Sequence, residues 1–343
     1  MSSLTSEART MCPELMEAVK LIDRLSYTKQ YAEVFGDLVD WIVWQHHYPP
    51  NEENPIAKYK EDEQQDFLEI FKVIQNETKK QSGLHNKDAK GGWYDPLGRL
   101  YECITSKHKS SAMGQYFTPK HVVNLMTEIQ MANDVSSDDN RNFIATLDPA
   151  CGSGRMGLAA ASHAMAKGKA CWVTMNDLDP ICTKMTAANM CLNGVIGEAL
   201  CSNGLDITGE SYRFGYRVEP LIMQIEPEMR ETYRLIMMMQ TGQDVKKQYT
   251  VRPVSYEQTY LKSANDQMLQ QFQEKQAIKD EQQRERELNE LKEKVQDRMK
   301  GTLFANDNTQ ADNVSKLKPK KESAIERERK RRKPPKDNQP TLF

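Results

Sequence analysis

The sequence predicts an α/β protein with a doubly wound sheet, set between an N-terminal helical segment and a long C-terminal helix that ends in a basic tail. Residues 143–205 alternate short apolar runs with helical stretches in the order strand, helix, strand, helix. A glycine-containing turn joins the first run to its helix, as in parallel strand–helix units. We therefore expect a helical N-terminal domain over 1–92, a sheet domain over 93–256, a long charged helix over 257–304 and a disordered basic tail over 305–343.

The N-terminal part is predicted to be helical because its apolar residues recur at the spacing of one helix face. A second stripe of this kind follows the acidic start Glu61-Asp62-Glu63, and the pair Pro49-Pro50 breaks the helix between the two stripes. We expect both stripes to form a core and to bind no ligand. The first stripe consists of Val34, Phe35, Leu38, Val39, Ile42 and Val43.

The sheet domain is predicted as a series of short elements, because short apolar runs are typical of buried parallel strands. In chain order we expect a helix over 98–106, a loop over 114–119, a helix over 120–131, a strand over 143–147, a helix over about 156–167, a strand over 171–175 and a helix over about 180–192. The pattern that follows favours a strand within 211–222, a helix over 226–240 and a strand over 248–256.

The C-terminal part is predicted from its charge. Residues 255–300 contain no Gly or Pro, and the last thirty of them carry eight basic and eight acidic side chains, which is typical of a solvated helix. Residues 313–343 carry eleven basic and four acidic side chains. We expect residues 305–343 to be disordered, and we expect residues 313–336 to bind nucleic acid without sequence preference, or else only to keep the chain soluble.

Composition excludes several classes of protein. No apolar run approaches the ~18–20 residues that span a bilayer, so we expect no membrane association, and the N-terminus lacks the apolar core of a signal peptide. The seven cysteines form no CxxC motif, which favours reduced thiols and a cytoplasmic protein. The six histidines form no metal-binding motif, so we expect no metal site.

The most informative segment is the glycine loop, residues 148–154, which reads Asp-Pro-Ala-Cys-Gly-Ser-Gly between a predicted strand and a predicted helix. Such a loop lets the backbone approach a ligand closely, and the helix start offers free N–H groups. Arg155-Met156 follows, so the Lys-Ser/Thr pair of a phosphate loop is missing. The spacing of Gly152, Gly154 and Gly157 satisfies GxGxxG, but that pattern alone is weak.

Two acids narrow the ligand class. Asp148 ends the first predicted strand, and Asp177 ends the second. An acid in the second position accepts hydrogen bonds from ribose hydroxyls in nucleotide-binding sheets. S-adenosylmethionine (SAM) needs both a ribose acceptor and a loop for its amino-acid end, so it fits this pair. The alternative is that both acids only cap turns.

The segments GQYFTP, TLDPACGSGRM and NDLDP together resemble adenine-N6 DNA methyltransferases, especially the modification subunits of type I restriction–modification systems. The segment DPLGRLYE, from Asp95 to Glu102, resembles the stretch that precedes GQYFTP in those subunits. The resemblance covers about 95–206. It implies a SAM-dependent methyltransferase-like (Rossmann-like) sheet over 93–256, SAM as the cofactor and DNA as the substrate of a DNA-binding transferase.

The resemblance also implies site residues. In the family, the FTP and DPACGSG loops hold the methionine end of SAM, the acid after the second strand holds the ribose, and a loop after the third strand contacts the adenine. In this sequence the residues implied to bind the cofactor are Gln115, Tyr116, Thr118, Asp148, Ala150, Gly152, Gly154, Asp177 and Asn203.

The sequence departs from the family at the catalytic loop, which reads Asn/Asp-Pro-Pro-aromatic after the fourth strand. Its oxygens accept hydrogen bonds from the target amine and its aromatic ring stacks on the flipped base. Residues 204–264 contain no Asn, and Pro-Pro occurs only at 49–50 and 334–335. The catalytic residues are therefore unknown, and the weak candidates near the expected place are Tyr216, Glu219 and Pro220.

Three functions stay open. The first is an adenine-N6 DNA methyltransferase with an aberrant or degenerate catalytic loop. The second is a catalytically inactive SAM-binding relative that acts as a DNA-associated regulatory or assembly subunit. The third is methylation of protein glutamine, which uses the same missing loop. Because no region is large enough for a separate DNA-reading domain, we also expect a separate specificity subunit.

The last five residues, Gln-Pro-Thr-Leu-Phe, resemble the peptide with which bacterial DNA-processing proteins dock on the replication sliding clamp. Leu342 and Phe343 would enter an apolar pocket, and Gln339 would make polar contacts at its edge. The motif has three fixed positions, so a chance match is the alternative.

Overall fold

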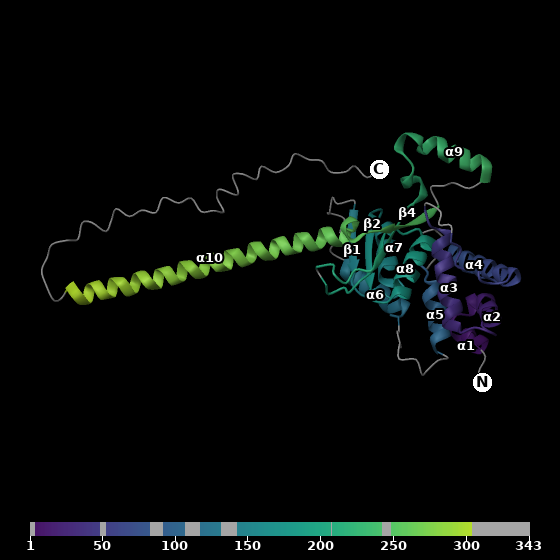
Figure 1. Cartoon of the computed structure of the whole chain (residues 1–343), viewed down its shortest axis with the longest axis horizontal. Helices are drawn as coiled ribbons and strands as arrows, with labels where there is room; N and C mark the ends of the chain where they lie inside the picture. The colour runs from purple at the N-terminus through teal and green to yellow at the C-terminus, as the bar shows by residue number, and fades with distance from the viewer. Residues whose placement is uncertain are drawn as a thin grey trace. The chain divides into compact units, whose positions relative to one another are not determined.

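The computed structural model describes residues 4–48, 53–82, 92–106, 117–131, 143–206, 208–241 and 248–303. The chain divides into two compact units, residues 1–271 and 272–343. The sheet and all the helices before α10 lie in the first unit (Figure 1). The boundary that we predict near residue 92 falls inside this unit and stays a proposal.

The N-terminal segment is helical, as its apolar periodicity predicts. Every residue of the stripe on α3 is buried, and the acidic first turn of α4 favours a helix start because it complements the helix dipole. Within the predicted helical domain over 1–92, two helices, α1 and α2, precede this stripe. The helices are α1 (Leu4–Met11), α2 (Met16–Leu25), α3 (Tyr31–Gln45), α4 (Glu61–Gln81), α5 (Pro96–Ser106) and α6 (Lys120–Met131).

A five-stranded sheet forms the centre of the first unit, which confirms the predicted α/β class. Its order is β1-β2-β3-β4-β5, with β1, β2 and β3 parallel and with β4 and β5 added in antiparallel pairings. The strands are β1 (Phe143–Asp148), β2 (Ala170–Asp177), β3 (Gly197–Cys201), β4 (Phe214–Pro220) and β5 (Tyr249–Val254).

Two crossover helices connect the parallel strands, α7 (Arg155–Ala166) and α8 (Pro180–Asn193). The Asp179 side chain accepts a hydrogen bond from the Ile181 amide and so caps the start of α8, while Gly194 ends that helix in the left-handed region with φ +73°. Helices α3, α5 and α8 pack together, so one core cluster joins the N-terminal helices to the sheet.

The position of β1 is the main feature that the sequence does not predict. A doubly wound sheet has its first strand in the centre, because the strand order reverses there. In this chain the later strands β4 and β5 are added beside β3, and within the described ranges β1 pairs with β2 alone. The carboxyl end of β1 therefore lies at the edge of the sheet.

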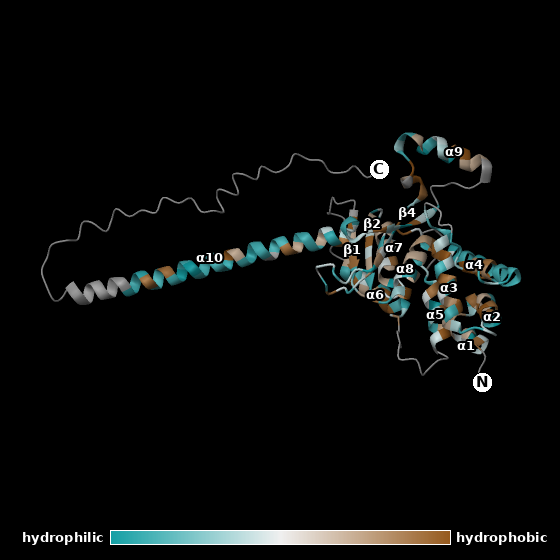
Figure 2. Cartoon of the chain, viewed as in Figure 1, coloured by the Kyte–Doolittle hydropathy of each residue, from teal (hydrophilic) through white to brown (hydrophobic). Residues whose placement is uncertain are grey.

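The elements after β3 follow the predicted order of strand, helix, strand and long helix. Helix α9 (Arg230–Thr241) lies between β4 and β5, and α10 (Tyr260–Leu303) follows β5. Near the start of α10, Leu261 packs against Leu200 and Val254. Figure 2 shows that α10 is mostly hydrophilic. The predicted disordered tail and the clamp-like residues Gln339, Leu342 and Phe343 lie outside the described residues.

Over the ranges that the structure describes, no helix combines the length and apolar character needed to cross a membrane.

Candidate functional site

A cavity of about 240 Å³ opens where β1 and β2 end. Parallel strands end at the same edge of a sheet, so Asp148 at the end of β1 and Asp177 at the end of β2 both reach it. The segment before α6 forms another wall with Phe117 and Thr118. Five of the residues predicted to bind a cofactor line this one cavity, namely Thr118, Asp148, Ala150, Gly152 and Asp177.

The glycine loop has the conformation that its sequence predicts. Gly152 and Gly154 have positive φ values of +57° and +91°, which side chains adopt rarely. The Gly152 N–H donates to Asp177 Oδ2 at 2.8 Å, which ties the loop to the second acid. A Cβ atom on Gly152 would lie 2.8 Å from the Phe117 ring, so the ring covers the loop only because glycine stands there.

The charge of Asp177 acts on Asp148. Burial raises the pKa of Asp148, and the nearby negative charge of Asp177 raises that pKa further, while the Ala150 N–H, 3.1 Å from Asp148 Oδ1, opposes the rise. A partly buried carboxylate beside another negative charge is stabilised by a cation. The cavity is therefore electrostatically suited to a ligand with a positive charge.

Replacing Asp148 with asparagine is expected to raise the free energy of unfolding of the ligand-free protein by about 0.5–2 kcal/mol at neutral pH. A raised pKa means that the folded state holds the proton more tightly than the unfolded state, so ionised Asp148 destabilises the fold. Asparagine removes that charge and keeps an oxygen for the Ala150 N–H.

The gain from Asp148→Asn should shrink as the pH falls through the raised pKa of Asp148 and vanish below its ordinary value of 3.8. Urea unfolding curves of both proteins at several pH values measure this difference. A gain that does not change with pH would contradict the electrostatic origin.

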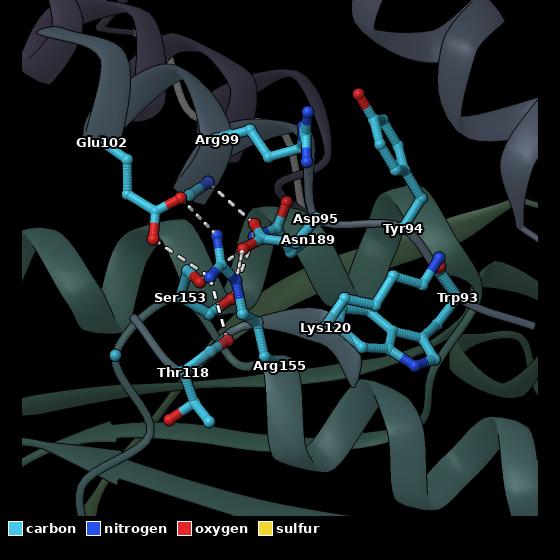
Figure 3. Close-up of polar contacts among 12 residues, drawn as sticks. Trp93, Tyr94, Asp95, Arg99, Glu102, Thr118, Lys120, Ser153, Arg155 and Asn189 are labelled. Atoms are coloured by element: carbon cyan, nitrogen blue, oxygen red, sulfur yellow. Dashed lines mark hydrogen bonds and ion pairs between the residues drawn. The ribbon is translucent and has the colours of Figure 1, made fainter. Parts of the chain in front are cut away.

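A buried ion-pair network supports the cavity (Figure 3). Arg155 opens α7 and donates from Nε to Asp95 Oδ2 at 2.6 Å, from two nitrogens to the Glu102 carboxylate at 3.0 and 2.9 Å, and to the Thr118 carbonyl at 3.0 Å. Its guanidinium also lies 5.3 Å from the centre of the Phe117 ring. One side chain thus joins the glycine loop, helix α5 and the 117–119 segment.

Asp95 is the second centre of this network, and its carboxylate is surrounded by donors. Besides Arg155 it accepts from the Ser153 hydroxyl at 2.6 Å, the Asn189 amide at 2.7 Å and the Gly98 N–H at 2.7 Å. Sequence reasoning missed Arg155 and Asp95 as supporting residues. The sequence feature that could have identified these two residues is their position. Asp95 is the first residue of the segment DPLGRLYE, and Arg155 directly follows the glycine loop.

Two further residues predicted to bind the cofactor, Gly154 and Asn203, do not line the cavity. Gly154 precedes α7 as its N-cap residue. Asn203 lies in the loop after β3, where its Oδ1 accepts from the Leu205 N–H at 3.1 Å. A Cβ atom on Gly204 would collide with the Pro149 carbonyl, so this loop packs directly on the glycine loop. Gln115 and Tyr116 fall outside the described residues.

The structure does not bring the weak catalytic candidates to the cavity. All three lie on β4, which two strands separate from β1. Glu219 pairs with Arg252 on β5 at 2.9 Å, and Pro220 lies opposite Tyr249 on that strand. Tyr216 packs against the core. Burial, together with the smaller effect of the charge of Asp40, raises the pKa of Tyr216 to about 12.

Cysteines and metals contribute no chemistry that the structure supports. All seven cysteines are free, and burial raises the pKa of Cys151, the thiol within the glycine loop, which disfavours its reactive thiolate. Within the described part of the chain, no group of three His, Cys, Asp or Glu side chains is placed to hold a metal ion.

A glycine loop and two acids at the ends of parallel strands form an arrangement found in nucleotide-binding α/β sheets. Residues 93–207 match the family N-6 DNA Methylase. This match confirms the resemblance that the sequence motifs indicate, over about the same segment.

Two solved structures resemble the chain. One is described as a class I S-adenosylmethionine-dependent methyltransferase from Listeria monocytogenes, with 14% identity, a TM-score of 0.35, and coverage of 57% of this chain and 55% of that chain. The other is a type I restriction-modification system methyltransferase subunit from Streptococcus thermophilus, with 15% identity, a TM-score of 0.28, and coverage of 55% and 56%. This chain thus covers little more than half of each. No curated protein matches it.

Proposed function

We propose that residues 93–207 bind SAM in the cavity at the ends of β1 and β2, and that the chain is the cofactor-binding part of an adenine-N6 DNA methyltransferase. The observation that carries this proposal is the convergence of Thr118, Asp148, Gly152 and Asp177 on one cavity, within the segment that matches the N-6 DNA methylases.

The residues present suit SAM chemically. SAM carries a positively charged sulfonium and an ammonium group, and the cavity offers the carboxylates of Asp148 and Asp177. Asp148 would hold the amino-acid end together with Thr118 and the glycine loop. Asp177 keeps lone pairs for the ribose hydroxyls while its two oxygens accept from the Gly152 and Asp179 N–H groups. Bound SAM would supply an electrophilic methyl group.

The chain's own residues explain cofactor binding better than methyl transfer. An exocyclic amine becomes a nucleophile only when nearby oxygens accept its hydrogen bonds. Among the described residues that line the cavity, the carboxylates are those of the two acids that we assign to SAM. We therefore propose that the catalytic loop is degenerate in this chain. The alternative is an inactive SAM-binding subunit that regulates or assembles a DNA-modifying complex.

Calorimetric titration of the full chain with SAM tests the cofactor proposal. Wild-type protein should bind SAM or S-adenosylhomocysteine, and Asp177→Ala should weaken binding by about 1–3 kcal/mol, because a polar ribose would lose its buried partner. Asp266→Ala is the matched control, since Asp266 forms an exposed pair with Lys262 on α10 and should leave the affinity unchanged. Wild-type protein without affinity for either ligand would refute the proposal.

The proposed partners follow from the same family match. We propose DNA as the substrate and a separate specificity subunit as the sequence reader, in a complex located in the cytoplasm. The binding of nucleic acid by residues 313–336 and the docking of Gln339, Leu342 and Phe343 on a sliding clamp stay predictions.

A further inference from the structure

The open edge of β1 is the feature that the proposed function leaves unexplained. In the described ranges β1 pairs with β2 alone, so no described residue pairs with the N–H and C=O groups on its other side. Strands of parallel sheets are normally covered on both faces and paired on both sides when they carry the glycine loop of a doubly wound fold. The strand order in this chain thus stops where the second half of such a sheet would begin.

Apolar side chains flank this open edge. Along β1 successive side chains alternate between the two faces of the sheet, and Leu147 on one face is 52% exposed. Helix α6 covers the other face through Met131, which packs with Ile144. Met126 of α6, which is 41% exposed, lines the same hollow beside β1 as Leu147. Exposed apolar groups gathered along an unpaired strand are typical of an interaction surface.

A hollow lies beside the edge and adjoins the cofactor cavity. Its volume is about 390 Å³, and α6, β1 and α7 form its walls. Asp148 and Met156 line both this hollow and the cavity at the ends of β1 and β2. Whatever pairs with β1 in the parallel direction would therefore end directly beside the cavity, because parallel strands end at the same edge.

We propose that a partner protein adds a strand parallel to β1 and places its following loop next to Asp148, where it supplies the hydrogen-bond acceptors for the target amine. The strand addition follows from the open edge, and the chemistry of the loop rests on the proposed function. Two chains would together form one methyltransferase site.

Within residues 1–343, no segment outside the described ranges has the composition of such a strand. A buried strand needs a run of about four to eight mainly apolar residues, and the parts of the sequence outside the described ranges contain no run of even three. A second copy related by a two-fold axis would pair β1 with β1 in the antiparallel direction. Its loop would then lie at the opposite end of the strand, away from this cavity.

A photo-crosslinking amino acid at Leu147, in the full chain expressed in the cells that carry its gene, tests the proposal. The same group at Leu68, which is 40% exposed on α4, is the matched control. We expect Leu147 alone to capture a second protein whose sequence contains a strand-like apolar run followed by a loop with Asn or Asp, proline and an aromatic residue. Leu147→Lys should reduce copurification of that protein at least tenfold, and Leu68→Lys should leave it unchanged.

Purified together, the two proteins should transfer label from SAM to DNA at least tenfold faster than either alone. Capture of a second copy, no capture at Leu147, or a pair that forms equally well with Leu147→Lys would overturn the proposal. SAM titration of the chain alone separates the two ideas. If that titration fails while Leu147 still captures the partner, the cofactor proposal falls and the strand addition stands.

Discussion

Replacing Arg155 with methionine is expected to lower the free energy of unfolding by about 3–5 kcal/mol. Methionine fills a similar volume but leaves Asp95 and Glu102 without their cation. Asp95 is fully surrounded by protein and only 2% of its side chain is exposed, so its charge cannot be rehydrated without opening the fold. The variant also loses the bond to the Thr118 carbonyl, so SAM affinity should fall together with stability.

Two further variants make this measurement decisive. Lys20→Ala removes an exposed pair with Glu17 and should cost no more than about 1 kcal/mol. Glu102→Gln keeps the shape of one acceptor and removes one charge, so it should cost less than Arg155→Met and still fold if that variant does not. Equal urea midpoints for Arg155→Met and Lys20→Ala would show that the buried network does not stabilise the protein.

Much of the fold follows from local sequence pattern. The helix over 120–131 and the strands and helices between residues 143 and 193 lie within two residues of their predicted bounds, because glycine, proline and apolar spacing mark their ends in the sequence. The sequence pattern predicts no bounds for β3. The assignment of both acids to one ligand follows from their positions at the ends of the first two predicted strands. Each of these inferences depends on residues that are close in sequence or on a rule of sheet geometry.

The features that sequence pattern missed depend on long-range placement. Arg155 bonds to Glu102 and Asp95, which lie more than fifty residues earlier, and no spacing rule connects such residues. Strand order is equally non-local, since nothing in the apolar run of β1 shows which strands lie beside it. Tyr216 and Glu219 were placed near the catalytic loop by their order in the chain, whereas β4 lies beyond β3 in the sheet.

Methylation of DNA by the purified chain alone is expected to be at least about 10²–10³-fold slower than by an adenine methyltransferase with an intact catalytic loop. Loss of a single preorganised hydrogen-bonding group from a transition state typically costs that factor. Here the amide, the proline carbonyl and the stacking ring of that loop are all missing from residues 204–264. Transfer of label from SAM to unmethylated DNA measures the rate.

The assay needs SAM binding as its internal control, because a chain that binds no SAM would be inactive for another reason. An intact adenine methyltransferase under the same conditions gives the reference rate. Rapid formation of N6-methyladenine by this chain alone would contradict the expectation and would require an acceptor beside the cavity. Glu219 could be that acceptor only if it left Arg252, and Glu219→Gln would then have to remove the activity. A chain that is inactive by itself and active with a strand-donating partner is the result expected from the open edge of β1.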